Sequence, residues 1–411
     1  MSNGKKFMNK DNISAIVTAV AVVSLITGFG IYFNFYGNAS HSYIQQKQLE
    51  DAVGQSSTKS GDLIKLKLNK TAFTSIDKSG FTKAPELTGV DHYINTESNQ
   101  PIRLSDLKGK VVLLDFWTYT CINCIRTIPY LNDWYNRYSG QGFAIVGVHS
   151  PEFEFEKNPD NVQDAVNEFG IKYPVVLDSE HKTWDAYNNN YWPRHYLIDS
   201  QGYIRGDHIG EGGYSETEKT IQTLLAEKAA LENKTEITFN LNKGNLTNTA
   251  SDSLAYTDTN QMISPEIYLG YSSARSPLGN TEGFRPDKEI DYKLDPSITS
   301  FEPNIAYLDG IWKNNKDNMQ LEGDEGKIVL TYYAKTINFV ASGNGQNVTI
   351  FENKGSPKET NNHATDIGKD GRVVVDKQRL YNIGLYDDYK PRSAVIDVKG
   401  KGFQIYTFTF G

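Results

Sequence analysis

Cysteine is scarce in this chain, since its 411 residues contain only Cys121 and Cys124. A disulfide between these neighbours would close almost no chain, so it would stabilise the fold little through loop entropy. Structural zinc sites need about four ligands, and no second cysteine pair exists. Covalent haem attachment needs a histidine directly after the second cysteine, where Ile125 stands. The pair therefore indicates redox chemistry through its own reversible disulfide, with no metal and no bound cofactor.

The chain also lacks an excess of basic residues. It has 42 lysines and arginines against 50 acidic residues, a net charge of −8. Nothing in this balance suggests the basic surface that nucleic-acid binding requires, so we expect no nucleic-acid partner. The length and the 38% hydrophobic content suffice for two ordinary domains.

One hydrophobic run is long enough to cross a membrane. Residues 13–33 carry no charge, lysines precede them, and the next lysine or arginine is Lys47. Because roughly 20 apolar residues span a bilayer and positive flanks stay inside, we expect a cytoplasmic tail (1–12) and a single-pass anchor (13–35). The domains that follow would lie outside the cell membrane. Signal cleavage near Ser40 is the alternative.

The remainder divides into four segments by its pattern. Residues 36–83 are polar and read as a spacer, and residues 234–264 are rich in Asn, Thr and Ser and read as a linker. Between them, residues 84–233 alternate strands with helices, which predicts an α/β domain. We expect its strands at 111–117, 142–149, 173–177, 194–199 and 203–209, and its helices at 121–138, at 162–169 and in a segment ending near 232.

Residues 265–411 contain short β runs separated by turns and no convincing helix. This pattern predicts an all-β sandwich. We expect its strands at 327–333, 337–341, 347–352, 372–375, 379–385, 394–398 and 402–410.

The two cysteines follow an apolar strand and open a helix, the layout of a thioredoxin-type redox site. The helix N-terminus favours thiolate over thiol, so Cys121 is the expected nucleophile. Cys124 lies one turn further in and would resolve the mixed disulfide. Arg126 adds a positive charge that could lower the pKa of Cys121 further, although an exposed surface arginine fits equally well.

Cys124 must lose a proton before it can attack, and Asp115 is the candidate base because it ends a strand made of Val and Leu. A solvent-facing aspartate is the alternative. Pro193 precedes a strand, where a cis proline would place the Trp192 backbone beside the sulfurs. Trp117 and Tyr119, in the lead to the first cysteine, complete the candidate substrate contacts together with Trp192.

Three further residues could approach the sulfurs. His149 and His195 fit packing or surface roles better than a role in the chemistry. Glu152 could overhang the site, but a solvated loop face explains the alternation of Glu and Phe at 152–156 as well.

The run from Leu104 through Trp117-Thr-Tyr-Thr-Cys121-Ile-Asn-Cys124, the segment after Val148 and the segment Trp192-Pro-Arg-His-Tyr resemble the thioredoxin-like domain of the DipZ family. That family is related to extracytoplasmic thioredoxins of the TlpA and ResA type. The resemblance implies Cys121 and Cys124 as the redox pair, Asp115 as the buried acid and Pro193 as the cis proline.

The resemblance extends to Ser264-Pro-Glu-Ile-Tyr and to the end of the chain. There it implies a β-sandwich, a jelly roll of the kind found in carbohydrate-binding modules. DipZ proteins carry a multi-span membrane domain that passes electrons, whereas this chain has one hydrophobic run without cysteine. The resemblance therefore implies exported proteins with disulfides as substrates and a separate CcdA-type membrane protein as electron donor.

The expected function is a membrane-anchored thiol-disulfide oxidoreductase, a reductase or isomerase rather than an oxidase. A thiol peroxidase is one alternative, but Leu114 stands where its motif needs proline. A glycan-binding or surface protein whose β-sandwich is the active part is another. For glycan contact, Trp312 is the one tryptophan of the C-terminal half.

Overall fold

The computed structural model describes residues 57–60, 62–241, 261, 263–297, 300–352, 364–368 and 370–411. They fall into two compact units. Residues 57–80 and 222–240 form the first, and residues 81–221 with 241–411 form the second. The expected tail and anchor lie outside the described residues. Among those that are described, we find no helix with the length and hydrophobicity needed to cross a membrane.

The first unit contains a small antiparallel sheet of β1 (Ser57–Ser60), β2 (Leu63–Lys67) and β9 (Glu236–Asn240). After it, Asn69 accepts a hydrogen bond from the backbone of Ala72 and so caps the short helix α2 (Lys70–Thr74). Parts of the expected spacer and linker thus form this sheet. Apolar residues at alternate positions of β2 are consistent with a strand that covers one face.

An α/β sheet forms the first part of the second unit, with the strand order β3-β6-β5-β4-β7-β8. Strands β4, β5 and β6 are parallel, while β3, β7 and β8 run antiparallel to their neighbours. The bounds are β3 (His92–Ile94), β4 (Val111–Trp117), β5 (Phe143–His149), β6 (Val175–Leu177), β7 (Arg194–Ile198) and β8 (Ile204–Ile209). Every residue of β4 and β5 is buried, as expected for central strands covered on both faces.

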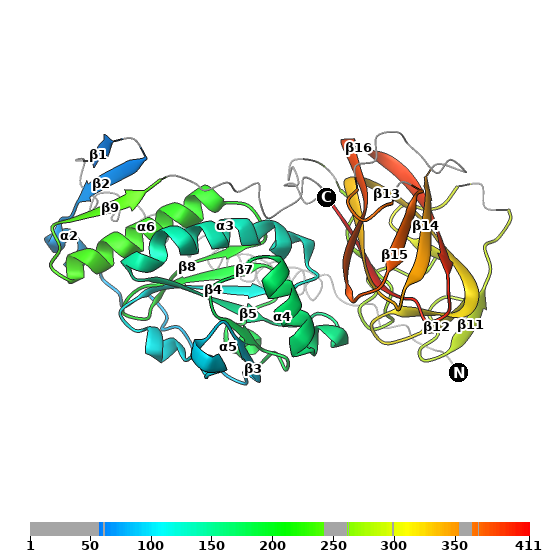
Figure 1. The fold of residues 1–411 in the computed structure, drawn as a ribbon, viewed down its shortest axis with the longest axis horizontal. Helices are drawn as coiled ribbons and strands as arrows, with labels where there is room; N and C mark the ends of the chain where they lie inside the picture. Colours follow the sequence, from blue (N-terminus) through cyan, green and yellow to red (C-terminus); the bar gives the residue numbers. More distant parts are fainter. Residues whose placement is uncertain are drawn as a thin grey trace, which may run out of the picture. The chain divides into compact units, whose positions relative to one another are not determined.

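Helices cover this sheet on both sides, with α3 on one side and α5 on the other (Figure 1). Their bounds are α3 (Ile122–Tyr138), α4 (Pro159–Glu168), α5 (Lys182–Ala186) and α6 (Tyr214–Leu231), the last of which continues into the first unit. On one face of β4, Leu114 and Phe116 pack against Tyr187 and Tyr196. Side chains alternate along a strand, so Asp115 points to the opposite face, toward α3. The expected α/β domain is confirmed.

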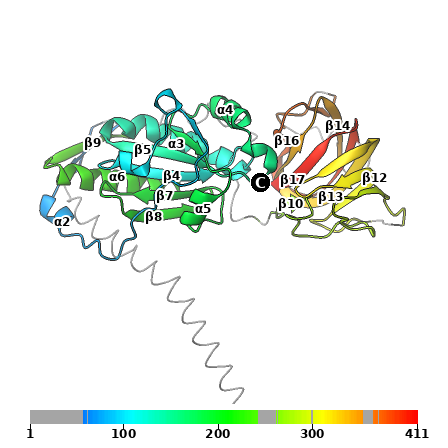
Figure 2. The same cartoon turned by 90° about the horizontal axis from the view of Figure 1, so that it is seen from below.

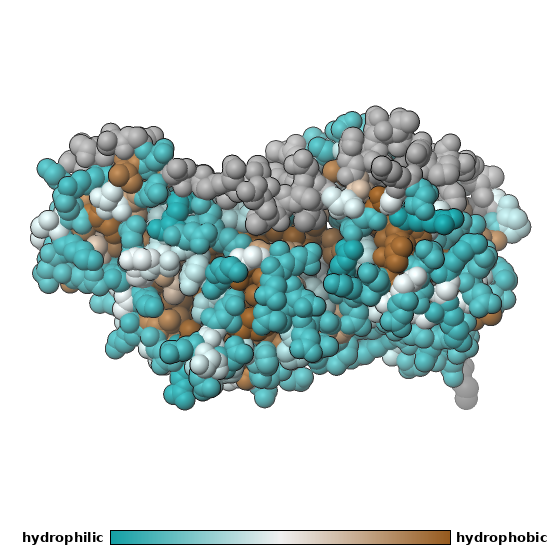
Figure 3. All heavy atoms as spheres, viewed as in Figure 1, coloured by the Kyte–Doolittle hydropathy of each residue, from teal (hydrophilic) through white to brown (hydrophobic). Residues whose placement is uncertain are grey.

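The second part of this unit is all β, as expected. Its eight strands form one antiparallel sheet that curls around a core containing Trp312 and Phe339 (Figure 2). Two strands are far longer than expected because bulges let them bend without breaking. The bounds are β10 (Ile267–Tyr268), β11 (Glu289–Tyr292), β12 (Ala306–Asn314), β13 (Met319–Ser342), β14 (Gln346–Glu352), β15 (Arg372–Val375), β16 (Arg379–Lys399) and β17 (Gln404–Phe410). In Figure 3, hydrophilic side chains dominate the described surface that faces the viewer.

Candidate redox site

Cys121 is the N-cap of α3, and its sulfur accepts a hydrogen bond from the backbone N–H of Cys124 at 3.3 Å. Both cysteines are free thiols in this structure. Cys121 is partly exposed, whereas Cys124 is 1% exposed. The structure thus places a partly exposed cysteine at the head of a helix and a shielded cysteine one turn behind it.

Burial raises the pKa of the Cys121 thiol, although the hydrogen bonds from Cys124 act in the opposite direction. The negative charges of Glu266 and Glu152 raise it further. The pKa of Cys124 is raised still more strongly, by burial, by Cys121 and by the charge of Asp115. The expected lowering of the Cys121 pKa at the helix N-terminus is therefore outweighed by burial.

Asp115 is buried beneath the cysteines, at 1% exposure, and does not face solvent. Its carboxylate Oδ1 lies 3.2 Å from Nε2 of His195, which is equally buried. The charge of Asp115 acts on Cys124, so the two side chains are close enough to interact. This is the arrangement expected of a base that serves the resolving cysteine.

Arg126 is buried rather than a surface arginine, with 4% of its area exposed. Its guanidinium donates to the carboxylate of Glu211 at 3.1 Å. Its charge is compensated by Glu211, so we assign it a role in holding α3 to the loop after β8.

The Trp192–Pro193 peptide bond is cis, as the sequence predicts. The indole of Trp192 donates to the backbone oxygen of Ser150 at 3.0 Å and packs against Trp184, with 4.4 Å between ring centroids. Trp192 keeps part of its surface exposed, and the neighbouring Tyr191 is 50% exposed. These two side chains remain available to a substrate.

Trp117 and Tyr119 differ from the expectation that they contact substrate. Trp117 is fully buried, and Tyr119 is 4% exposed. Their rings enclose His149 by an edge contact and a stacked contact. Burial lowers the pKa of His149 to about 3, so its imidazole is neutral at physiological pH. The three side chains support the loop before Cys121 from within.

Glu152 is held by Tyr268, whose hydroxyl lies 2.5 Å from the carboxylate of Glu152 and 2.8 Å from that of Glu266. One phenolic hydrogen can serve only one of these contacts, so the second requires a proton on one of the carboxyls. Consistently, burial and the charge of Glu266 raise the pKa of Glu152 to about 8. Glu152 is thus a shared, protonatable group, and its charge acts on Cys121.

Glu156 has a role that the sequence did not reveal. Its buried carboxylate accepts hydrogen bonds from the Thr120 hydroxyl at 2.5 Å and from the backbone N–H groups of Glu152 and Phe153 at 2.6 and 3.0 Å. It therefore ties the loop before Cys121 to the turn after β5. Only its position at the third residue of a turn, where carboxylates reach back to free N–H groups, could have indicated this role.

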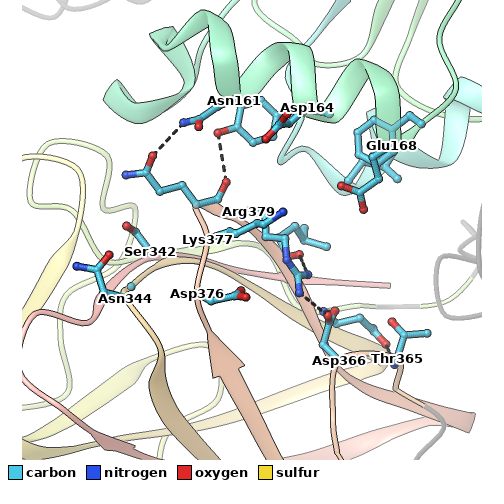
Figure 4. A pocket seen from close by; sticks show the side chains of 18 residues that line it. Asn161, Asp164, Glu168, Ser342, Asn344, Thr365, Asp366, Asp376, Lys377 and Arg379 are labelled. Carbon is cyan, nitrogen blue, oxygen red and sulfur yellow. Dashed lines mark hydrogen bonds and ion pairs between the residues drawn. The ribbon is translucent and has the colours of Figure 1, made fainter.

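A cavity of about 590 Å³ lies beside this loop. Tyr119, α4 and loops of the β region line it with polar and charged side chains (Figure 4). Tyr119 donates to the backbone oxygen of Gln378, while Arg379 pairs with Asp366 at 2.7 Å. The cavity therefore offers hydrogen-bond donors and acceptors beside an aromatic ring.

The comparisons with known proteins agree with this geometry. Residues 264–411 match a family described as "Thioredoxin like C-terminal domain", and residues 82–206 match the "AhpC/TSA family". Protein DipZ from Mycobacterium bovis is 33% identical over 330 residues, which cover 80% of this chain and 43% of DipZ. The chain thus spans less than half the length of DipZ.

Two further relatives match the α/β part alone. The thiol-disulfide oxidoreductase YkuV from Bacillus subtilis is 32% identical over 35% of this chain and 94% of YkuV. The thiol-disulfide oxidoreductase ResA from Bacillus thuringiensis is 36% identical over 27% of this chain and 61% of ResA.

Proposed function

The chain belongs to the thioredoxin-like thiol-disulfide oxidoreductases that include DipZ and YkuV, and we propose that it reduces or isomerises disulfides of exported proteins. The observation that carries this proposal is the partly exposed Cys121 at the N-terminus of α3, with the shielded Cys124 and the buried Asp115 behind it.

The reaction uses these groups in order. The Cys121 thiolate attacks a substrate disulfide, forms a mixed disulfide and releases one substrate thiolate, which takes a proton from solvent. Cys124 then gives its proton to Asp115 and attacks the Cys121 sulfur. The second substrate thiolate leaves and takes a proton from solvent, so the substrate disulfide has gained two electrons and the two cysteines that supplied them are left as a Cys121–Cys124 disulfide.

The raised pKa values favour the reducing direction. A strong oxidant of this fold owes its potential to a stabilised thiolate in the reduced form. Here burial raises the pKa of both cysteines, so the reduced form lacks that stabilisation. The disulfide is then the favoured product, and the protein gives electrons to its substrate.

Turnover of a model protein disulfide tests the proposal. The full chain should accelerate insulin reduction by dithiothreitol, and Cys121→Ser should abolish the effect. Cys124→Ser should instead trap a mixed disulfide on Cys121 that mass spectrometry detects. His92→Gln, on the edge strand β3, is a matched control that should leave the rate unchanged. Hydrogen peroxide turnover without protein-disulfide reduction would instead support the thiol peroxidase alternative.

We further propose that the chain is anchored in the cell membrane by residues 13–35, with its domains outside the cytoplasm. The 411 residues hold no thiol beyond the redox pair, so electrons from across the membrane would need a separate carrier. A CcdA-type membrane protein is the proposed donor. Membranes that lack any such carrier should fail to reduce the Cys121–Cys124 disulfide, and full reduction there would contradict this partner.

A second candidate function is glycan contact by the C-terminal part. Trp312 cannot provide a sugar platform because it is fully buried. The cavity beside Tyr119 fits better, because polar side chains such as Asn161 and Arg379 line it next to an aromatic ring. If it binds sugars, glycan-array binding should survive the double replacement of both cysteines by serine and be lost in Arg379→Ala. Binding that depends on the cysteines would contradict it.

A further inference from the structure

A row of proton-binding side chains crosses the sheet beneath the cysteines. In strand register, Asp115 of β4 pairs with His195 of β7, and His195 pairs with His208 of β8. Directly paired residues of neighbouring strands share one face of the sheet. Asp115 and His195 are each 1% exposed, whereas His208 is half-buried. The row thus leads from the buried carboxylate toward the edge of the sheet.

The members of the row are close enough for proton transfer with small movements. Nε2 of His195 lies 3.2 Å from Oδ1 of Asp115. The rings of His195 and His208 are stacked, with 6.2 Å between centroids and 19° between planes. One bridging water molecule or a small rotation spans such a gap. Gly213 leaves room for the outer imidazole, because a Cβ there would lie 2.6 Å from its Cε1.

Several polar atoms of this row have no hydrogen-bond partner outside the row. Oδ1 of Asp115 and Nε2 of His195 lie 3.2 Å apart and have no hydrogen-bond partner elsewhere among the described residues, and Nδ1 of His195 and Nε2 of His208 have none there either. An unsatisfied buried polar atom is unfavourable, because it has lost its hydrogen bonds to water. A packing role for His195 would leave this cost uncompensated, whereas proton transfer requires atoms that are free to gain and lose a proton.

We propose that His195 takes the proton that Asp115 removes from Cys124 and passes it through His208 to solvent. The inference rests on the proposed thiol-disulfide function. The Cys124 proton moves to the Asp115 carboxylate, then to a ring nitrogen of His195, which becomes a cation and returns Asp115 to its charged form. His195 then loses a proton toward His208, and the row is ready for another turnover. His195 acts through Asp115 and is a positioning residue rather than a catalytic one.

The surrounding charges favour one proton in the row at a time. Burial lowers the pKa of His208, and the charge of His195 lowers it further. A hydrogen bond to the backbone of Glu211 and the charges of Asp207 and Glu216 act in the opposite direction. Cys124 on α3 and Tyr173, which also senses the charge of Asp115, complete the set of titratable groups around the inner end. Two cations side by side are therefore disfavoured.

The test separates the two thiol steps with the disulfide reagent DTNB. Attack by Cys121 releases a first coloured thiolate, and attack by Cys124 on the mixed disulfide releases a second. Stopped-flow traces between pH 6 and pH 9 give both rates for the full chain. The variants are His195→Gln, which keeps a polar amide, His195→Phe, His208→Gln and the control His92→Gln.

We expect both His195 variants to slow the second release at pH 7 by about 10-fold, the low end of proton-transfer effects. His208→Gln should slow it by less. The first release should stay within about twofold, which also shows that the variants are folded. The defect should shrink toward pH 9, because hydroxide then takes the proton directly, a rescue that a structural role does not predict.

Either of two results would overturn the inference: a normal second release in His195→Gln, or a defect of equal size at every pH. If the unaltered chain itself gave no second release, the proposed function would fail instead. The two failures are therefore distinguishable.

Discussion

Burial and hydrogen bonding shift the pKa of Cys121 in opposite directions. Its sulfur accepts a hydrogen bond at the helix N-terminus, yet burial and the acidic residues Glu152 and Glu266 raise its pKa. The thiolate is therefore the minor form at neutral pH, and reaction rates should increase with pH.

The shared proton of Glu152 gives a first prediction. Because the pKa of Glu152 is about 8, Glu152→Gln removes little charge at pH 7 and a full charge at pH 9. Iodoacetamide labelling of Cys121 should be unchanged at pH 7 and about threefold faster at pH 9, equivalent to about half a pKa unit. Glu154→Gln is the matched control, since Glu154 is 77% exposed and pairs with Lys157. If the unaltered chain, Glu152→Gln and Glu154→Gln were labelled at equal rates at pH 9, Glu152 would not hold a proton that it loses between pH 7 and pH 9.

Asp115 gives a second prediction at the residue scale. Asp115→Asn removes the base while keeping a buried polar side chain, so the attack of Cys124 on the mixed disulfide should slow by about 10²-fold. The mixed disulfide should then accumulate during turnover, which mass spectrometry of the quenched reaction detects. An unchanged lifetime of that intermediate would exclude Asp115 as the base.

At the scale of elements, the loop before α3 depends on Glu156. Glu156→Gln places an amide N–H group against the donors from Thr120, Glu152 and Phe153. The free energy of unfolding should fall by about 1 to 3 kcal/mol, the cost of unsatisfied buried donors. Urea unfolding measures the change, and Glu154→Gln should stay within about 0.5 kcal/mol. A loss of the same size in both variants would show that the buried carboxylate does not hold the loop.

Regular elements of the α/β domain could be predicted from the sequence because their signals are local. The apolar run of β4 and the start of α3 after Cys121 agree with the expected bounds to within one residue. The β region was harder, because β16 continues through a register shift at Asp387 and Asp388 and past Pro391, residues that normally indicate the end of a strand. Asp115 could be placed by its apolar context, whereas His195 could not, since its pairing with Asp115 depends on strand order.

Contacts between distant parts of the chain escape sequence reasoning for the same physical reason. Tyr268 lies more than a hundred residues after Glu152, and nothing in either segment indicates that they meet. Likewise, the partner of Arg126 is Glu211, which follows a different strand. Charge and burial of such side chains are decided only when the strands and loops assemble.

At the scale of the whole molecule, two buried groups predict how stability depends on pH. The pKa of His149 is lowered to about 3, so the folded state binds fewer protons and gains stability as the pH rises toward 6.5. The pKa of Glu152 is raised to about 8, so the folded state binds more protons and loses stability as the pH rises from about 4.5 to 8. Above pH 6.5 the contribution of His149 no longer changes, and only the loss of stability that comes from Glu152 remains.

Urea unfolding at pH 6.5 and pH 8 checks this balance. The free energy of unfolding should be lower at pH 8, and Glu152→Gln should reduce the difference because an amide does not titrate in this range. A free energy that rises between these two pH values would contradict the assignment of a shared proton to Glu152.

The most direct test of the account is the redox potential of the Cys121–Cys124 pair. Equilibration of the full chain with glutathione or dithiothreitol buffers, followed by thiol labelling and mass spectrometry, gives the ratio of dithiol to disulfide. The raised pKa values of both cysteines predict a reversible two-electron transition with a midpoint below about −230 mV, in the range of reductants of this fold. A midpoint near about −120 mV, or two cysteines that never form a disulfide with each other, would contradict it.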